Sequence, residues 1–451
     1  MNKISRSEFI RLSVLAGAGF SLLPSSAVFG NNNSKLRLGI IGTGLRGQEL
    51  LRLSLQRDDT IVPALCDIDE RMLGKALSIY DKAGKPHPEI YKADNMAWQH
   101  LLARPDLDAV LIATPWEWHY PMAMEALQAG KHVGCEVIMG TTIEEHWDIV
   151  RQSESTGMQY MMLENVCYRR DVMAVLNMVR QGVFGELIHM QAGYQHDLRE
   201  VKFNDGIQPY GGGFLFGPEA FSEARWRTQH SLERNGDLYP THGIGPVSKM
   251  LKVHAGNRFV SLNSMASKGR GLHEYILDQA GPEHPNAKRD FKLGDVVTTM
   301  IKTANGESIL LQHDTNLPRP YSLGFRVQGT KGLWMDVNKS IFIEGQSAPH
   351  RWEEAQSWLQ RYDHPLWKRL ENYAEGAGHG GMDFFVVNAF IQAIKNAATV
   401  PIDVYDSAAW SVITPLSETS IAQNGSPQDF PDFTNGTWKT KPDIFALDDR
   451  Y

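Results

Sequence analysis

Three glycines near the start of the chain have the spacing of a phosphate-binding turn. The stretch from Gly42 to Gly47 reads Gly-Thr-Gly-Leu-Arg-Gly and separates a strand-like apolar run from an amphipathic one. In a G-x-G-x-x-G motif, Gly42 permits the tight turn, Gly44 lets a pyrophosphate approach the main chain, and Gly47 lets helix and strand lie close together. The N-terminus of the following helix offers free N–H groups and a positive dipole end to the anion.

An acidic residue follows this turn at the distance that a dinucleotide site requires. The apolar run 61–66 reads Ile-Val-Pro-Ala-Leu-Cys and ends at Asp67, roughly 20 residues after Gly47. A carboxylate there accepts hydrogen bonds from the adenosine ribose hydroxyls, so the two motifs together predict NAD rather than NADP. The alternative is an ordinary strand–helix turn that binds no ligand.

The segments around these motifs alternate between strand-like and helix-like patterns. Strands are predicted at 36–41, 61–66, 107–113, 131–136 and 159–165, and helices at 48–55, 70–82, 119–129 and 141–156. This alternation predicts an α/β fold, a doubly wound parallel sheet or Rossmann domain over residues 35–160. Ligands bind beyond the carboxyl ends of such strands, which would bring Asp67, the segment 114–119 and Glu136 around one crevice.

Beyond residue 160 the pattern changes to mostly strands. Strand-like runs occur at 187–194, 258–265, 295–301, 308–313, 323–329 and 332–337, and helical runs at 171–181, 382–396 and 405–421. We therefore predict a second, α+β substrate domain over residues 161–430 with an open, largely antiparallel sheet. The glycine-rich segment 204–217 is expected to be a loop over the site, and residues 431–451 an irregular tail.

The composition is that of a globular protein without a nucleic-acid partner. The 451 residues are 42% hydrophobic and 22% charged, with a net charge of −7, and no basic block alternates with aromatic residues. The three cysteines, Cys66, Cys135 and Cys167, are far apart in the sequence, so we expect buried thiols. The histidines are scattered as well and have no Cys or carboxylate group at ligand spacing, so we expect no metal site.

The first 30 residues have the features of an export leader. Lys3, Arg6 and Arg11 give a positive start, an apolar run from Leu12 to Pro24 follows, and small residues lead to Gly30. That run is too short to span a bilayer in the mature chain, so we predict a signal peptide over residues 1–30 and a periplasmic or cell-envelope location. The segment 5–11 is similar to a twin-arginine signal with one arginine replaced by serine. An uncleaved anchor is the alternative.

Together the motifs resemble the Gfo/Idh/MocA oxidoreductase family over nearly the whole mature chain. Besides the glycine turn and Asp67, the resemblance depends on Ala-Thr-Pro at 113–115, on Ala-Gly-Lys-His-Val at 129–133 leading to Glu136, and on His242 opening a helix. Two positions depart from the family. Its members typically carry a catalytic lysine where this chain has Val137, and an aspartate four residues before the late histidine, where this chain has Leu238.

This combination resembles one branch, the NAD-dependent α-N-acetylgalactosaminidases of glycosidase family 109. The longer matching strings lie at 116–119, 162–165, 236–243, 318–321, 378–382 and 401–405. The resemblance implies NAD contacts from Leu45, Arg46, Asp67, Trp116, Glu117, Trp118, His119, Glu136, Val137 and Asn165. It implies contacts with a terminal N-acetylgalactosamine of a glycan or glycoconjugate from Tyr194, Arg227, Tyr239, Pro240, Thr241, His242 and Tyr321.

A glycosidase that uses NAD needs no pair of carboxylates. Hydride leaves C3 of the sugar for the nicotinamide while a base takes the hydroxyl proton, and the resulting ketone acidifies the hydrogen on C2. A second base removes that proton, the group at C1 leaves by elimination, water adds at C1, and the hydride returns to C3. The cycle has no net redox change, and the protein supplies positioning and proton transfer.

Tyr239, His242 and Tyr321 are the predicted proton-transfer residues. Tyr239 and His242 are three residues apart, so at a helix start they would share one face and act on adjacent carbons. Histidine suits a base near neutral pH, and a tyrosine would need an electropositive setting, which Arg227 and the oxidised nicotinamide could supply. Which residue takes which proton stays open. So do the plainer roles: His242 as a helix cap or core residue, Tyr194 and Tyr321 as core residues, and Arg227 as a surface or stacking residue.

Two other functions remain open from the sequence. A sugar dehydrogenase with net turnover of NAD would accumulate NADH, although Val137 in place of the lysine favours the glycosidase. A non-catalytic, NAD-stabilised sugar-binding protein would have no activity for His242→Ala to remove. An open sheet of this kind is also compatible with a homo-oligomer.

Overall fold

The structure is a computed structural model that describes residues 35–448, and the predicted leader at 1–30 lies outside the described residues. Its N-terminal part contains a six-stranded parallel sheet in the order β3-β2-β1-β4-β5-β6. The strands are β1 (Leu36–Ile41), β2 (Thr60–Cys66), β3 (Glu89–Tyr91), β4 (Ala109–Ile112), β5 (His132–Cys135) and β6 (Tyr160–Met162). This order is that of a Rossmann fold, so the predicted doubly wound sheet is confirmed.

Five helices connect these strands: α2 (Leu45–Leu55), α3 (Glu70–Ala83), α4 (Ala97–Leu102), α5 (Trp116–Gln128) and α6 (Ile143–Thr156). Two of them, α3 and α6, have caps that the sequence supplies. Helix α6 begins with a capping box, because the Thr142 side chain accepts from the Glu145 N–H and the Glu145 side chain accepts from the Thr142 N–H. Helix α3 ends at Gly84, whose φ of 61° lies in the left-handed region. These caps fix the start of α6 and the end of α3.

The second half of the chain contains a mixed sheet. Within residues 35–448 it has nine strands in the order β14-β13-β12-β11-β7-β10-β9-β8-β15. Their bounds are β7 Leu187–Gln195, β8 Phe259–Ala266, β9 Val296–Thr303, β10 Ser308–Asp314, β11 Arg326–Gly329, β12 Gly332–Met335, β13 Ser340–Ile343, β14 Glu353–Glu354 and β15 Gln428–Asp429. In this described sheet β7 and β10 pair in parallel and all other neighbours are antiparallel. The prediction of a largely antiparallel sheet is confirmed, while the short strands β13, β14 and β15 were not predicted.

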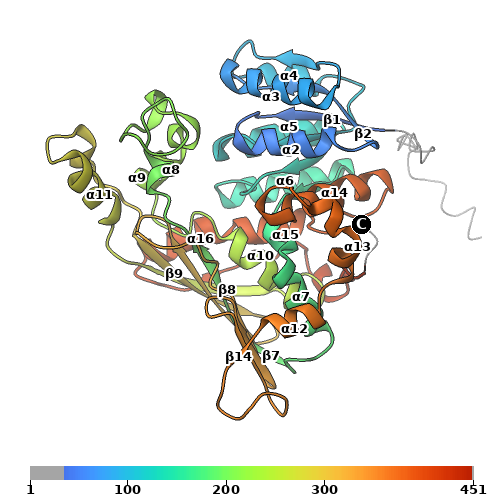
Figure 1. The fold of residues 1–451 in the computed structure, drawn as a ribbon, viewed down its shortest axis with the longest axis vertical. Coiled ribbons are helices and arrows are strands. Elements are labelled where there is room, and N and C mark those ends of the chain that lie inside the picture. Colours follow the sequence, from blue (N-terminus) through green and yellow to red (C-terminus); the bar gives the residue numbers. More distant parts are fainter. Residues whose placement is uncertain (1–34, 449–451) are drawn as a thin grey trace, which may run out of the picture.

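Helices of the second half lie between the two sheets and around the second one (Figure 1). They are α7 (Arg170–Arg180), α8 (Arg199–Lys202), α9 (Arg227–Glu233), α10 (Thr241–Met250), α11 (Gly271–Ala280), α12 (Gln356–Arg361), α13 (Pro365–Ala374), α14 (Met382–Lys395), α15 (Val404–Ser411) and α16 (Ile413–Ala422). The single helix predicted at 405–421 is wrong, because α15 ends at Ser411 and α16 begins at Ile413. Pro415 has no N–H to donate to the Ser411 carbonyl, so a proline there fits the first turn of a new helix.

Helix α14 returns from the C-terminal half to cover the Rossmann sheet beside α2 (Figure 1). A Cβ added at Gly134 in β5 would lie 3.4 Å from the Phe390 ring. Arg57 donates to the Asn388 side chain at 2.8 Å, and Lys395 contacts Asp59 at 3.2 Å. The two halves therefore share one core. No helix within residues 35–448 is long and apolar enough to cross a membrane.

Candidate functional site

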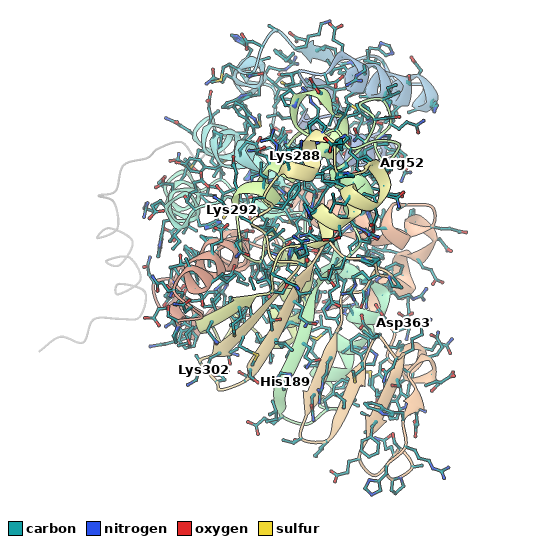
Figure 2. The ribbon with its side chains drawn as sticks, turned by 90° about the vertical axis from the view of Figure 1, so that its left-hand side faces the viewer. Arg52, His189, Lys288, Lys292, Lys302 and Asp363 are labelled. Atoms are coloured by element: carbon teal, nitrogen blue, oxygen red, sulfur yellow. The ribbon has the colours of Figure 1, made fainter. Side chains whose placement is uncertain are left out.

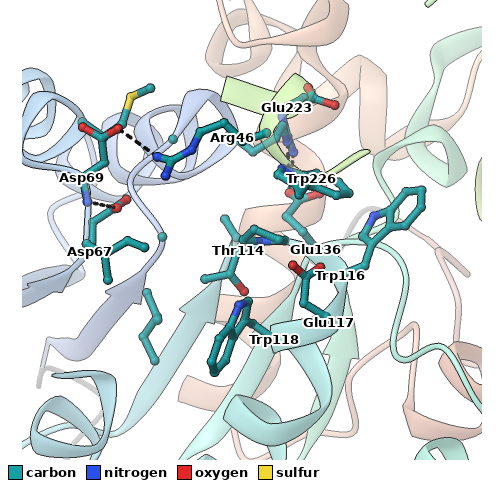
Figure 3. Close-up of a pocket in the computed structure, with 18 of the residues that line it drawn as sticks. Arg46, Asp67, Asp69, Thr114, Trp116, Glu117, Trp118, Glu136, Glu223 and Trp226 are labelled. Atoms are coloured by element: carbon teal, nitrogen blue, oxygen red, sulfur yellow. Dashed lines mark hydrogen bonds and ion pairs between the residues drawn. The ribbon is translucent and has the colours of Figure 1, made fainter. Parts of the chain in front are cut away.

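A cleft of about 370 Å³ opens at the carboxyl ends of the Rossmann strands. One wall comes from the N-terminal half and contains Gly42, Gly44, Leu45, Arg46, Asp67, Trp116, Glu117, Trp118, Glu136 and Val137. The opposite wall comes from the second half, from the segment 222–227 and from Tyr239. Asp67 and Asp69 lie toward one end of the cleft and Trp116 and Trp226 toward the other (Figure 3). Most residues predicted to contact a cofactor thus line a single cavity.

The glycine turn has the geometry that a pyrophosphate needs. Gly42 has a φ of 89°, and a Cβ at Gly47 would lie 1.9 Å from the Gly42 carbonyl oxygen, so Gly47 lies under the turn and not in the cleft. At Gly44, by contrast, no described atom lies within 4 Å of where a Cβ would be. No side chain of the described chain caps the N-terminus of α2. The open face at Gly44 and the uncapped helix start therefore fit the phosphates of NAD.

Asp67 holds the turn and faces the cleft. Its Oδ2 accepts from the Thr43 N–H at 2.6 Å and from the Thr43 hydroxyl at 2.9 Å, and its Oδ1 accepts from the Asp69 N–H at 2.8 Å. A carboxylate oxygen has two lone pairs, so these bonds leave acceptor capacity for ribose hydroxyls. The position of Asp67 at the end of β2 and its remaining capacity to accept hydrogen bonds both fit NAD.

Two cofactor residues predicted from the sequence lie behind the wall of the cleft. His119 is buried, and its Nδ1 and Nε2 lie 2.6 Å and 2.8 Å from the carbonyl oxygens of Ile138 and Thr114. It therefore supports the segment that carries Trp116 and Trp118 and does not itself line the cleft. Asn165 is also buried and donates to Asp383 at 2.6 Å.

Four predicted sugar residues form one aromatic cluster next to the cleft. The Tyr239 ring lies 4.6 Å from the Tyr194 ring and 4.8 Å from the His242 ring. Tyr321 lies 6.3 Å from Tyr194 and is 49% exposed, so it stands at the mouth of the cluster. Pro240 and Thr241 are buried behind these rings. The structure thus brings together residues that are up to 127 positions apart in the sequence.

Tyr239 and His242 are not on one helix face, contrary to the prediction. Helix α10 begins at Thr241 after Pro240, so Tyr239 lies outside it. A residue before a proline is disfavoured in the helical region, which explains why the helix cannot extend back to Tyr239. The two rings are neighbours nevertheless, in an edge-to-face arrangement with an interplanar angle of 78°.

Arg227 is a stacking residue of the site and not a surface residue. Its guanidinium carbon lies 5.1 Å from the ring centres of Trp116 and Trp226 and 5.2 Å from that of Tyr239. Its Nε lies 2.6 Å from a Glu223 oxygen. The cation therefore joins the Rossmann wall to the aromatic cluster.

The tyrosines do not have the lowered pKa that a tyrosine base would need. Burial raises the pKa of Tyr239 well above its ordinary value, although the nearby Arg227 opposes the shift. Burial likewise raises the pKa of Tyr194, and it raises the pKa of Tyr321 to about 12. The charge of Arg227 by itself does not offset the loss of hydration at Tyr239, and the predicted contribution of the oxidised nicotinamide stays a prediction.

Glu164 is the residue of this site that the sequence did not single out. Its side chain is fully buried at the end of β6, and its Oε2 lies 2.9 Å from Nδ1 of His242. Its Oε1 accepts from the Val166 N–H at 3.0 Å. The signal available was indirect: the aspartate expected at 238 is absent, so the histidine needs a carboxylate from elsewhere. His196 was also missed as a neighbour, and its Nδ1 lies 3.2 Å from the Tyr194 hydroxyl.

Cysteines and candidate metal ligands lie apart from this arrangement. Cys66, Cys135 and Cys167 are buried free thiols, as predicted. Among the residues that the structure describes, no three His, Cys, Asp or Glu side chains gather closely enough to hold a metal ion.

Two protein families match consecutive parts of the chain. The family described as "Oxidoreductase family, NAD-binding Rossmann fold" matches residues 36–164, and the family described as "Glycosyl hydrolase 109, C-terminal domain" matches residues 168–440. The chain is 57% identical to a glycosyl hydrolase family 109 protein from Stenotrophomonas maltophilia over 100% of both chains. It is 53% identical to an alpha-N-acetylgalactosaminidase from Tannerella forsythia over 93% of this chain and 90% of that protein.

Solved structures with the same fold include a dehydrogenase in complex with NADH and an NAD-binding oxidoreductase. Levoglucosan dehydrogenase in complex with NADH and levoglucosan superposes with a TM-score of 0.63 at 22% identity, over 88% of this chain and 100% of the other. An NAD-binding oxidoreductase from Klebsiella pneumoniae gives a TM-score of 0.64 at 17% identity, over 88% and 99%. At these identities the likeness establishes the two-domain fold.

Proposed function

The chain belongs to glycosyl hydrolase family 109 and is a glycoside hydrolase with an NAD-binding Rossmann domain, and from this premise we propose that it removes terminal α-linked N-acetylgalactosamine from glycans without net oxidation. The relative from Tannerella forsythia carries the name of that activity at 53% identity. The motifs around Trp116, Asn165 and Tyr239 support the same substrate.

The position of Tyr239 carries this proposal. Tyr239 lines the same cleft as the glycine turn and Asp67, and its ring lies 5.9 Å from Trp116 and 4.8 Å from His242. Two proton-transfer groups therefore stand where a sugar beside the nicotinamide would lie. Bound NAD supplies a reversible hydride acceptor, and the residues that fit it are Gly42, Gly44, Arg46, Asp67 and Glu136.

His242 is suited to remove a proton. The Glu164 carboxylate can only accept a hydrogen bond, so Nδ1 of His242 donates to it at 2.9 Å and Nε2 is left to take a proton. The buried negative charge also stabilises the imidazolium that forms. Tyr239 is a neutral phenol in these surroundings, because burial raises its pKa. We therefore assign His242 as a base and Tyr239 as a proton donor to a sugar oxygen.

The aromatic residues around the site would exclude bulk water, apart from the one water molecule that adds at C1. Trp116 is buried against Trp226 and Tyr239, with ring centres 5.0 Å and 5.9 Å away. A dry site strengthens the interactions of Arg227 and Glu164 with the reacting groups. Tyr321, at the mouth, is suited to contact a sugar as it enters.

One assay distinguishes this function from its alternatives. The purified holoenzyme is incubated with p-nitrophenyl α-N-acetylgalactosaminide while p-nitrophenol and NADH absorbance are read together. Release of p-nitrophenol without NADH supports the proposal, accumulation of NADH indicates a dehydrogenase, and neither signal indicates a binding protein. Running the reaction in deuterated water then tests the elimination step, because the product should carry deuterium at C2.

Export is part of the proposal. The positive start, the short apolar run and the small-residue exit of residues 1–30 support a signal peptide. Fractionation of cells expressing the full chain should place the mature protein in the periplasm or envelope, shortened by about 30 residues by mass spectrometry.

A further inference from the structure

Three hydrogen-bond donors surround the Asp383 carboxylate in the interior of the protein. Asp383 is the second residue of α14, and its side chain is 0% exposed. Its Oδ2 accepts from Nη1 of Arg46 at 2.8 Å and lies 2.7 Å from Nδ1 of His379, and its Oδ1 accepts from Nδ2 of Asn165 at 2.6 Å. A fully buried carboxylate with this many donors is held in one place.

One of these donors, Arg46, lines the NAD-binding cleft, and a second, Asn165, lies just behind its wall. Arg46 is the second residue of α2 and lies inside the glycine turn, and Asn165 follows β6. Arg46 also donates to Glu136 through Nη2 at 2.7 Å and through Nε at 3.1 Å. The network therefore runs from Glu136 through Arg46 to Asp383 and on to Asn165. The network joins three predicted cofactor residues, Glu136, Arg46 and Asn165. It does so through Asp383, which the cofactor motifs do not include.

The charges of this network are complementary. Burial raises the pKa of the Asp383 carboxyl, but the hydrogen bond from His379 and the charge of Arg46 outweigh it and hold the pKa below its ordinary value. Asp383 is therefore ionised and balances Arg46 together with Glu136. Without it, Arg46 would be free to turn toward Glu136 alone, and the Asn165 amide would lose its acceptor.

Asp383 is fixed by the second half of the chain. Just before α14, the Gly378 N–H donates to Glu49 of α2 at 2.8 Å. In the middle of α14 Asn388 contacts Arg57 at 2.8 Å, and at its C-terminal end Lys395 contacts Asp59 at 3.2 Å. Helix α14 is thus held against α2 and the residues that follow α2 by contacts before its start, in its middle and at its C-terminal end. The region of the family 109 C-terminal domain that includes α14 reaches the cofactor wall at this point.

We propose that Asp383 is a positioning residue for the cofactor: it fixes Arg46 and Asn165 in the arrangement that retains NAD, so that the C-terminal domain controls how tightly NAD is held. The inference rests on the proposed NAD contacts of Arg46 and Glu136, which line the cleft, and on the position of Asn165 directly behind them. Slow release of NAD suits a reaction that returns its hydride in every cycle, because the cofactor need not leave.

The test measures bound NAD and not glycosidase activity. The full-length holoenzyme is compared with D383N, with D383E and with a matched control, D363N. Asp363 is also a buried carboxylate that pairs with an arginine, Arg170, at 2.7 Å, and it lies far from Arg52 of α2 (Figure 2). NAD per mole of protein is determined after denaturation, and the rate of NAD loss is followed with charcoal as a trap. Far-UV circular dichroism checks that each variant is folded.

We expect D383N to lose NAD at least about tenfold faster than the wild type, because Arg46 loses its buried, charged hydrogen-bond acceptor. D383E keeps the charge but moves the carboxylate by one methylene, and about threefold faster loss is expected. D363N should release NAD at the wild-type rate. The proposal is overturned if folded D383N, or D383E where D383N does not fold, retains NAD as the wild type does. A failure of the glycosidase assay would leave this result unaffected, because NAD is measured chemically.

Discussion

Nδ1 of His242 donates to Oε2 of Glu164 across 2.9 Å, although the two residues are 78 positions apart. Glu164 is fully buried, whereas the His242 side chain is 16% exposed. The pair thus consists of a buried carboxylate and a histidine whose ring lies 4.8 Å from that of Tyr239 and 5.4 Å from that of Tyr194. In the larger oxidoreductase family that this chain resembles, an aspartate four residues before the histidine is typical. Here a carboxylate from the end of β6 occupies an equivalent chemical position.

Replacing Glu164 should slow the reaction more than it weakens substrate binding. In Glu164→Gln the amide no longer stabilises an imidazolium and can itself donate to Nδ1, which favours the wrong tautomer. We expect kcat to fall by at least about tenfold with KM nearly unchanged. The kinetic constants are measured from p-nitrophenol release. A second measurement follows deuterium uptake at C2 of the sugar product in deuterated water. Asp81→Asn, which changes an exposed Asp–His pair at 2.7 Å, should have wild-type kinetics; a wild-type kcat in E164Q would refute the assigned role.

Removing the Tyr239 hydroxyl should impair turnover and leave the cofactor in place. Tyr239→Phe keeps the ring contacts with Tyr194 and Trp116 but has no proton to donate. We expect kcat to fall by about 10²-fold or more, as for the loss of a general acid, with unchanged NAD content. Steady-state kinetics and NAD quantification give the two readouts. Tyr373→Phe, at a ring that is 70% exposed, is the control, and equal activity of Y239F and wild type would contradict the assignment.

The segment 220–227 should contribute to holding the cofactor at its adenosine end. It crosses from the second half to α3, where the Phe221 ring lies 4.4 Å from the Arg71 guanidinium and Arg225 lies 3.5 Å from Asp69. An exposed ion pair of this kind contributes up to about 1 kcal/mol, so Arg225→Ala should release NAD about two- to fivefold faster. Trapping with charcoal measures the rate. Arg151→Ala, which removes a surface pair with Asp148 at 2.6 Å, should release NAD as the wild type does.

Local sequence patterns were sufficient for the elements that carry the cofactor. The glycine turn, the apolar strands and Asp67 lie within 32 consecutive residues, 36–67, and their roles depend on backbone geometry that neighbouring residues determine. The start of α10 was misplaced because Pro240 restricts the residue before it, an effect that side-chain spacing does not reveal. The three tyrosines of the sugar cluster were found through motifs, but their raised pKa values depend on burial, which follows only from the fold.

The contacts that orient the site residues could not be predicted in this way. Asn165 and Asp383 are 218 positions apart, and nothing in the sequence around either one indicates the other. A buried carboxylate at the start of a helix resembles an ordinary first-turn acid, which is stabilising at that position without any ligand. Only the return of α14 onto α2 reveals that Asp383 faces Arg46 and not solvent.

The free energy of unfolding should carry a pH dependence from Asp237. This residue is buried two positions before Tyr239, accepts from the Tyr239 N–H at 3.2 Å, and has its pKa raised to about 7 by burial. An unfolded aspartate has a pKa near 4. Between these values the folded state holds a proton that the unfolded state has released, so this contribution to stability is complete below about pH 4 and is lost as the pH rises through about 7, at about 1.4 kcal/mol per pH unit. Asp237→Asn removes the titrating group, so its stability relative to the wild type should be greater at pH 8 than at pH 5. Urea unfolding at both pH values measures this difference, with Asp58→Asn at an exposed position as the control. An unchanged stability difference between the wild type and D237N at the two pH values would show that Asp237 does not titrate in this range.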